Sequence, residues 1–178
     1  TQRSTLFPYT TLFRSSLCHA FAAAGLDFVK DDHGLADHAF CPFAERVRAC
    51  LEATLRAAQV TGRRTRYVPN LIGSPETVLR QARIARELGV EAVMISPMLV
   101  GLPVLHELVR RHLDVPVLAH PAFGGALRIQ PRALLGQLFP LFGADAVIYP
   151  NVGGRFSYDR ATCEAIARTL RRPHVPIA

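Results

Sequence analysis

The sequence predicts an α/β fold in which parallel strands alternate with helices. Short, uninterrupted apolar runs recur along the chain, and a segment with helical spacing of its apolar residues follows each run. Continuous apolar strands are typical of a parallel sheet covered by helices. No GxGxxG motif follows the first strand, which argues against an open dinucleotide-binding sheet and favours a (β/α) barrel. Because a closed barrel needs eight strands, we interpret the chain as part of one.

The predicted elements follow in regular order from residue 16 onwards. Strands are expected at residues 26–29, 65–69, 92–95, 115–119 and 146–149, and residues 175–178 could open another. Helices are expected at residues 17–24, 43–60, 74–88, 103–113, 131–142 and 158–170.

Local signals place several helix ends. Ser74 is expected to cap the helix that starts with Pro75, since a serine oxygen accepts from the first free N–H groups and proline suits the first turn. Gly25, Gly89 and Gly143 are expected to end the helices before them, because glycine readily adopts the left-handed conformation of a helix end.

The first residues are predicted to be foreign to the protein. Residues 5–15 resemble the in-frame translation of a common DNA-sequencing adapter. Pro8 and several threonines interrupt the apolar run, so a secretory signal peptide is not indicated. We therefore expect residues 1–15 to be an artefact without a fold, and the native sequence to occupy residues 16–178.

Composition argues against several classes of protein. The net charge is +7, but the arginines are spread over several predicted helices, without the basic and aromatic stripe that nucleic-acid binding needs. No apolar run approaches the ~20 residues of a membrane span. The four cysteines lack CxxC spacing, so no zinc site or disulfide framework is indicated, and free thiols suit the cytoplasm.

Lys30 is the only lysine among 21 basic residues. A lysine can lose its proton and become a nucleophile, whereas an arginine stays charged. Lys30 directly follows the predicted strand 26–29 and precedes Asp31, Asp32 and His33. A surface lysine in a solvated run of charges is the alternative interpretation.

Polar residues follow every predicted strand, at the end where a barrel builds its active site. Residues 30–33 follow the first strand, and Asn70 and Gly73 follow the second. Ser96 follows the third strand, His120 the fourth, and the segment from Asn151 to Arg155 the fifth. His120 could instead be a hydrogen-bonded, partly buried ring. Residues 151–155 could be a flexible turn, or a mobile loop whose cation closes over an anionic substrate.

Three segments resemble one family. The sequence GLDFVKDD at residues 25–32 resembles the GxDFxKxD(E) signature of RuBisCO large chains. AHPAFGG at 119–125 and GADAVIYPNVGGRF at 143–156 resemble the RuBisCO-like proteins, the branch that does not fix carbon. The resemblance extends over residues 16–178 and implies a fragment of the C-terminal catalytic (β/α)8 TIM barrel, from about its second to its sixth strand.

The resemblance implies a metal site. Lys30 would react with CO2 to form a carbamate, and that carbamate and Asp32 would bind Mg2+. His33 stands where the family has glutamate. Because imidazole suits Mg2+ poorly, His33 implies a different metal, looser coordination or an acid–base role; we keep it as the third predicted ligand.

The remaining site residues argue against CO2 fixation. His120 matches a histidine that contacts substrate, but Pro121 replaces the usual arginine beside it. Arg155 replaces the lysine of carbon-fixing enzymes, and a guanidinium does not reproduce the geometry of an amine. The resemblance implies that Lys30, His120 and Arg155 are catalytic. It also implies that His120, Asn151 and Arg155 bind substrate.

The resemblance therefore implies that the full-length protein is an Mg2+-dependent, cytoplasmic lyase or isomerase. It would form a metal-stabilised enediolate from a phosphorylated keto-sugar or 3-oxo sugar-acid, leading to decarboxylation or to enolisation and isomerisation. A non-catalytic homologue with a binding or regulatory role is the alternative. A homodimer is expected, without nucleic-acid or membrane partners, and this piece alone should be inactive.

Overall fold

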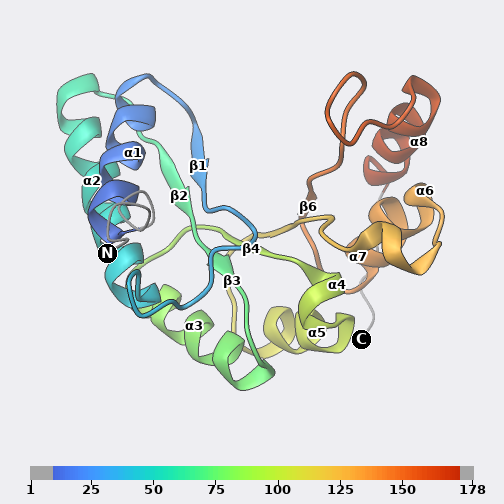
Figure 1. Ribbon diagram of the computed structural model, residues 1–178, viewed down its shortest axis with the longest axis horizontal. Helices are drawn as coiled ribbons and strands as arrows, with labels where there is room; N and C mark the ends of the chain where they lie inside the picture. Colours follow the sequence, from blue (N-terminus) through green and yellow to red (C-terminus); the bar gives the residue numbers. More distant parts are fainter. Residues whose placement is uncertain (1–9, 173–178) are drawn as a thin grey trace, which may run out of the picture. The chain divides into compact units, whose positions relative to one another are not determined.

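The computed structural model describes residues 10–172, which fall into two compact units divided between Val93 and Met94. In the first unit, helices α1 (Thr11–Ala23) and α2 (Phe43–Thr61) pack against each other beside strands β1 (Phe28–Lys30) and β2 (Arg66–Val68) (Figure 1). The two strands are parallel, with Phe28 opposite Arg66 and Lys30 opposite Val68.

The apolar face of α2 forms much of the first unit's core, as its helical spacing predicts. Its buried residues are Phe43, Arg46, Val47, Cys50, Ala53, Thr54 and Ala57. The backbone N–H of Phe43 donates to Asp37 Oδ1 at 2.8 Å, which satisfies an N–H group that the first helical turn leaves open. At the other end Gly62 adopts φ +68°, a left-handed conformation that ends the helix.

Strand β3 (Asn70–Leu71) and helix α3 (Pro75–Glu87) complete the first unit. The predicted strand 65–69 is divided from β3 at Pro69, because proline has no N–H for a strand ladder. Ser74 Oγ accepts from the Thr77 N–H at 3.2 Å and Pro75 begins the helix, so the predicted cap is confirmed.

The second unit contains strands β4 (Val93–Ile95, which starts at the unit boundary), β5 (Val117–Ala119) and β6 (Ala146–Val147). In the sheet, β5 lies between β4 and β6. Strands β5 and β6 are parallel. The helices are α4 (Pro97–Val100), α5 (Leu102–Arg111), α6 (Pro131–Ala133), α7 (Phe139–Leu141) and α8 (Arg160–Leu170), with a 3-10 turn η2 (Gly124–Leu127). A buried cluster lies between them: Ala119, Leu134, Leu135, Phe139, Ala144 and Ile166.

The helix predicted at residues 131–142 is interrupted by a π-helical turn, η3 (Leu134–Leu138). The Phe139 N–H donates to the Leu134 carbonyl, five residues back. Pro140 explains the interruption: it has no N–H, and its ring would clash with the carbonyl of residue 136 in a regular α-helix.

The parallel pairs and the alternation of strands with helices confirm the predicted α/β class. Residues 11–15, assigned above to the adapter, form the first turn of α1; because a helical conformation does not reveal a segment's origin, that assignment stays a prediction. The strand suggested at 175–178 lies outside the described residues.

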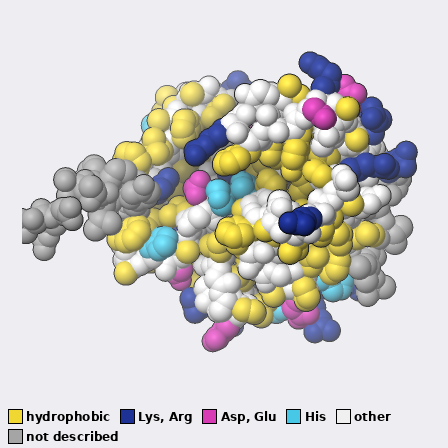
Figure 2. All heavy atoms as spheres, turned by 45° about the vertical axis from the view of Figure 1, so that its right-hand side comes forward, with side chains coloured by type: hydrophobic (Ala, Val, Ile, Leu, Met, Phe, Trp, Pro, Cys, Tyr) yellow, Lys and Arg dark blue, Asp and Glu magenta, His cyan; other side chains and the backbone are white. Residues whose placement is uncertain are grey.

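Within the described part of the chain, no helix is long and apolar enough to span a membrane. Figure 2 shows basic side chains in separate places among hydrophobic ones on the face it presents.

Candidate functional site at the carboxyl end of β1

The carboxyl end of β1 leads directly into the loop of residues 31–35, which carries the predicted metal ligands. Successive side chains of an extended chain point to opposite sides. Val29 and Asp31 are accordingly buried, while Lys30 and Asp32 are exposed. The strand therefore turns one carboxylate into the protein and presents an amine and a second carboxylate at the surface.

Asp31 is the centre of a buried polar network. Its Oδ2 accepts from Arg46 Nε and from the Asn70 backbone N–H, both at 3.1 Å, and its Oδ1 accepts from the Tyr67 hydroxyl at 2.7 Å. Arg46 has no exposed surface, and its Nη1 also donates to the Ala36 and Cys41 carbonyls at 3.1 Å. The network joins β1, α2, β2 and β3 directly behind the predicted site.

Electrostatics keep this network in one protonation state. Burial works against the charged form of Arg46, but the attraction of Asp31 and further partners outweighs it, so the pKa of Arg46 is raised. Burial and then the negative charge of Asp31 raise the pKa of Tyr67 well above its ordinary value. At neutral pH the guanidinium is therefore charged and the phenol keeps the proton that it donates to Asp31.

The three predicted metal ligands lie on consecutive or neighbouring positions of one short segment. Lys30 Nζ donates to the Asp31 carbonyl at 3.0 Å. Asp32 Oδ1 accepts from the Gly34 N–H at 2.8 Å, and its Oδ2 lies 3.9 Å from His33 Nδ1. The side chains of Asp32 and His33 are 63% and 44% exposed, so both remain accessible to an ion.

The chemistry of these donors fits a divalent ion only if Lys30 is modified. The described residues hold no group of three or more His, Cys, Asp or Glu side chains that could bind a metal ion. Asp32 and His33 supply two donors. An ammonium group cannot be a third, because it has no lone pair, whereas a lysine carbamate offers the anionic oxygens that Mg2+ prefers.

In the second unit, His120 follows β5 directly. Its backbone N–H donates to the Ile95 carbonyl at 2.8 Å, which fixes the strand end, and its Nδ1 accepts from the Ala122 N–H at 3.1 Å. In the neutral ring this contact places the remaining hydrogen on Nε2. The ring is half-buried and orientated by the chain that follows it, as the alternative interpretation of a hydrogen-bonded histidine required.

Asn151 and Arg155 lie on the exposed loop that follows β6. Gly153 adopts φ +83°, a turn conformation that suits glycine, and the Arg155 guanidinium lies 5.3 Å from the centre of the Phe156 ring. The structure thus brings Lys30, Asp32 and His33 together in the first unit, and places Asn151 and Arg155 on one loop of the second.

Sequence reasoning missed the roles of Arg46 and Tyr67. Arg46 is one of the arginines spread over the predicted helices, but it lies between Phe43 and Val47 on the apolar face of α2. A charged residue at a core position of an amphipathic helix signals a buried partner, because an unpaired buried charge is very costly. That signal predicts an acidic partner but does not say which one.

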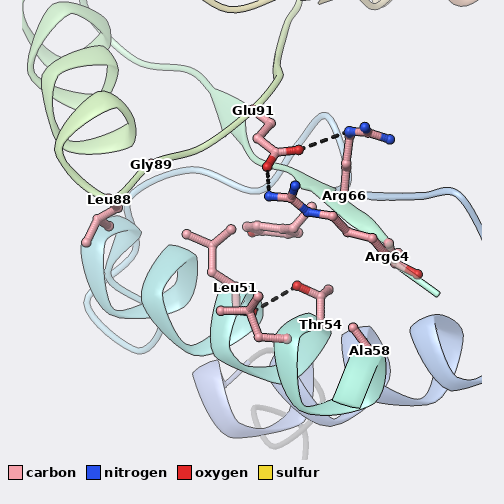
Figure 3. Close-up of a pocket in the computed structure, with 11 residues that line it drawn as sticks. Leu51, Thr54, Ala58, Arg64, Arg66, Leu88, Gly89 and Glu91 are labelled. Atoms are coloured by element: carbon pink, nitrogen blue, oxygen red, sulfur yellow. Dashed lines mark hydrogen bonds and ion pairs between the residues drawn. The ribbon is translucent and has the colours of Figure 1, made fainter. Parts of the chain in front are cut away.

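A pocket of about 120 Å3 lies elsewhere in the first unit, near the amino end of β2. Figure 3 shows Arg64 and Arg66 both turned towards Glu91, and Arg66 Nε lies 2.9 Å from Glu91 Oε2. Lys30 lies opposite Val68, at the carboxyl end of β2, whereas the pocket lies near the amino end of that strand. We therefore regard this pocket as an ion-paired surface feature separate from the predicted metal ligands.

Comparisons with known proteins identify the class and then the family. The chain is an α/β protein whose only lysine, Lys30, is exposed together with the carboxylate of Asp32 at the carboxyl end of β1. Residues 13–175 match the family model described as ribulose bisphosphate carboxylase large chain, catalytic domain. The chain therefore belongs to the RuBisCO large-chain family, as the sequence motifs predict.

Close relatives lie in the RuBisCO-like branch. The chain is 45% identical over 159 residues to a 5-methylthioribulose-1-phosphate isomerase of Rhodospirillum rubrum, which covers 89% of this chain and 42% of the relative. It is 36% identical over 164 residues to a 2,3-diketo-5-methylthiopentyl-1-phosphate enolase of Geobacillus thermodenitrificans, covering 88% and 40%. The crystal structure of a Rubisco-like protein from Rhodopseudomonas palustris matches with a TM-score of 0.85 and 46% identity, covering 90% and 46%. The chain spans less than half the length of these proteins.

Proposed function

We propose that the full-length protein carrying this sequence is a RuBisCO-like enzyme that enolises or isomerises a phosphorylated keto-sugar and does not fix CO2. The observation that carries the proposal is the exposed pair Lys30 and Asp32 at the carboxyl end of β1, held by a buried network on the other side. In this proposal residues 16–178 belong to the C-terminal catalytic barrel.

Lys30 is proposed to carry the modification that completes the metal site. Its ammonium group loses a proton, the amine nitrogen attacks the carbon of CO2 to form an N–C bond, and a second proton leaves to give the carbamate. Two protons are thus released for each CO2 bound. Lys30 is exposed, so CO2 can reach it without movement of the core. When bound to the carbamate, Asp32 and His33, a Mg2+ ion would polarise a substrate carbonyl and acidify the neighbouring C–H bond.

The other predicted residues have binding roles in this proposal. Arg155, exposed on its loop, would bind an anionic group of the substrate with its planar guanidinium. Asn151 would donate or accept hydrogen bonds from the same loop. His120, whose Nδ1 accepts from the Ala122 N–H, would contact a substrate oxygen or take part in proton transfer.

Isomerisation or enolisation is favoured over decarboxylation by the relatives. The two enzymes described above are named as an isomerase and an enolase of methylthio-sugar phosphates, and each covers most of this chain. A methylthio-ketose phosphate is therefore the proposed substrate class. A homodimer is part of the same proposal, and light scattering on the full-length protein tests it.

Solvent exchange tests the proposed activity. The full-length protein, with bicarbonate and Mg2+, is incubated in D2O with 5-methylthioribulose 1-phosphate or with the diketo phosphate, and deuterium incorporation is followed by NMR. We expect exchange of a substrate C–H proton and its loss in Lys30→Arg, which keeps the charge but cannot form the carbamate. Arg83→Lys, at an exposed position of α3, is the control and should leave exchange unchanged.

His33 favours one second candidate, a non-catalytic homologue with a binding or regulatory role, because imidazole replaces the hard oxygen donor that Mg2+ prefers. The same measurement separates the two. No exchange with any of these substrates, together with no binding of Mg2+ or Mn2+ by titration calorimetry, would support the non-catalytic protein.

A further inference from the structure

Asn70 holds the loop of predicted metal ligands from a different strand. Its backbone N–H donates to Asp31 Oδ2 at 3.1 Å. Its side-chain Nδ2 donates to the carbonyl of His33 at 2.9 Å and to that of Leu35 at 3.3 Å. One residue at the start of β3 therefore contacts the backbone or side chain of three residues in the five-residue loop.

The orientation of the Asn70 amide follows from these contacts. Both partners of its Nδ2 are carbonyl oxygens, which only accept hydrogen bonds, so the amide cannot be reversed without facing oxygen with oxygen. Its Oδ1 is consequently directed elsewhere, and it is buried without a hydrogen-bond partner among the described residues. Asn70 itself has no exposed surface.

An asparagine with a buried, unpaired oxygen is a poor choice for stability alone. Leaving a buried acceptor unsatisfied carries a desolvation cost, which offsets much of what the two Nδ2 contacts contribute. The residue is better explained by what its contacts fix, namely the path of the backbone through His33. That path decides where the side chains of Asp32 and His33 point relative to Lys30.

We propose that Asn70 is a positioning residue for the metal site, acting through the backbone of His33 and Leu35 rather than through contact with the ion. This inference rests on the proposed function, since it requires that Lys30, Asp32 and His33 bind a metal ion. Groups that orientate metal ligands without touching the metal commonly contribute 10–100-fold to metal affinity. We expect loss of the Asn70 amide to weaken Mg2+ binding by about that factor.

Gln81 provides a matched control in the same unit. It too is a fully buried amide that bonds to backbone at both ends: its Oε1 accepts from the Ile72 N–H at 2.9 Å and its Nε2 donates to the Ile72 carbonyl at 3.2 Å. These hydrogen bonds go to Ile72, which lies outside residues 30–35. Gln81→Ala therefore removes a comparable buried amide without touching the ligand loop.

The test uses the full-length protein with 13C-labelled bicarbonate. The carbamate resonance of Lys30 is recorded by 13C NMR as a function of Mg2+ concentration, and the melting temperature of each variant is measured without Mg2+. We expect Asn70→Ala and Gln81→Ala to lower the melting temperature similarly. Only Asn70→Ala should raise the Mg2+ concentration that gives half of the full carbamate signal, by about 10–100-fold. Asn70→Ser, with a shorter polar side chain, replaces the alanine variant if that one does not fold.

Three outcomes are distinguishable. A normal Mg2+ dependence in the Asn70 variant, or an equal loss in the Gln81 variant, overturns the positioning role and leaves the proposed function intact. Absence of the carbamate resonance from the unsubstituted protein contradicts the proposed function and this inference with it. A selective loss in the Asn70 variant supports both.

Discussion

Lys30 and Asp31 are neighbours in the chain with opposite surroundings. Lys30 is exposed at the strand end, whereas Asp31 is buried and receives hydrogen bonds from Arg46, Tyr67 and the Asn70 backbone. The buried carboxylate fixes the strand end by contacts to three other elements. It therefore determines the direction of the exposed amine without taking part in any proposed reaction.

Removal of one member of the buried ion pair should destabilise the protein strongly. Arg46→Met leaves Asp31 charged and deprived of its cation, and such a change typically costs about 3–5 kcal/mol. Urea unfolding of the full-length protein measures this cost. The double variant with Asp31→Asn should lose less than the sum of the two single losses, because the uncompensated charge is gone. Strict additivity would contradict a direct coupling between the two side chains.

Sequence reasoning found the residues with simple chemical signatures and missed those defined by packing. Lys30 was recognisable because it is the only lysine and ends an apolar run. The hydrogen bonds of the Asn70 side chain were not recognisable, because they go to the carbonyls of His33 and Leu35, which are 37 and 35 residues away in the chain. Backbone carbonyls have no sequence signature, so only the folded chain reveals such contacts.

At the scale of elements, helix spacing predicted α2 and α3 to within one or two residues, since long amphipathic periods and caps carry a strong signal. The helix predicted at 131–142 was wrong in detail because Pro140 forces a π-helical turn. The short helix α4 and strand β3 were not predicted. The four residues of α4 are too few to show a helical period, and β3 is set apart from the predicted strand 65–69 by Pro69.

Gly143 should be intolerant of any side chain. It adopts φ +102°, and a Cβ there would lie 2.7 Å from Val109 Cγ1 on α5. Backbone strain of this kind costs about 1–3 kcal/mol, so Gly143→Ala should lower the free energy of unfolding by at least that amount. Gly125→Ala is the control, because an added Cβ meets nothing within 4 Å. Equal stability of the two variants would show that the conformation at Gly143 is not constrained.

The start of α8 should show a pH-dependent cap. Asp159 Oδ1 accepts from the Thr162 N–H at 2.6 Å. Hydrogen bonding with the backbone and the side chain of Thr162 lowers the pKa of Asp159. A carboxylate with a lowered pKa stabilises the fold above its ordinary pKa, and this contribution is lost as the pH falls through the lowered value. Asp159→Ala should therefore melt below the unsubstituted protein at neutral pH, and the difference should shrink in acid. A difference independent of pH in calorimetric scans would rule out a charged cap.

At the scale of the whole molecule, family motifs predicted more than elements did, because three motifs in the correct order specify a fold that single strands do not. The sequence did not reveal how much apolar surface the described chain leaves exposed. Phe28 on β1 is 57% exposed and Leu26 is 48% exposed, and Figure 2 shows further exposed hydrophobic side chains. Exposed apolar side chains on and beside an edge of a sheet favour association.

The 178-residue chain alone should therefore associate. We expect light scattering at micromolar concentration to report aggregates that grow with time, and the full-length protein to remain of defined size. Replacing exposed Phe28 with serine should slow the association of the chain. A stable, monodisperse 178-residue chain that does not bind a hydrophobic dye would contradict this expectation.

The proposed chemistry requires that Lys30 captures CO2 and thereby completes a metal site with Asp32 and His33. A crystal structure of the full-length protein grown with bicarbonate and Mg2+ tests this directly. We expect electron density for a carbamate on Lys30 Nζ and an ion in contact with that carbamate and with Asp32. An unmodified amine and no ion beside Asp32 under those conditions would contradict it.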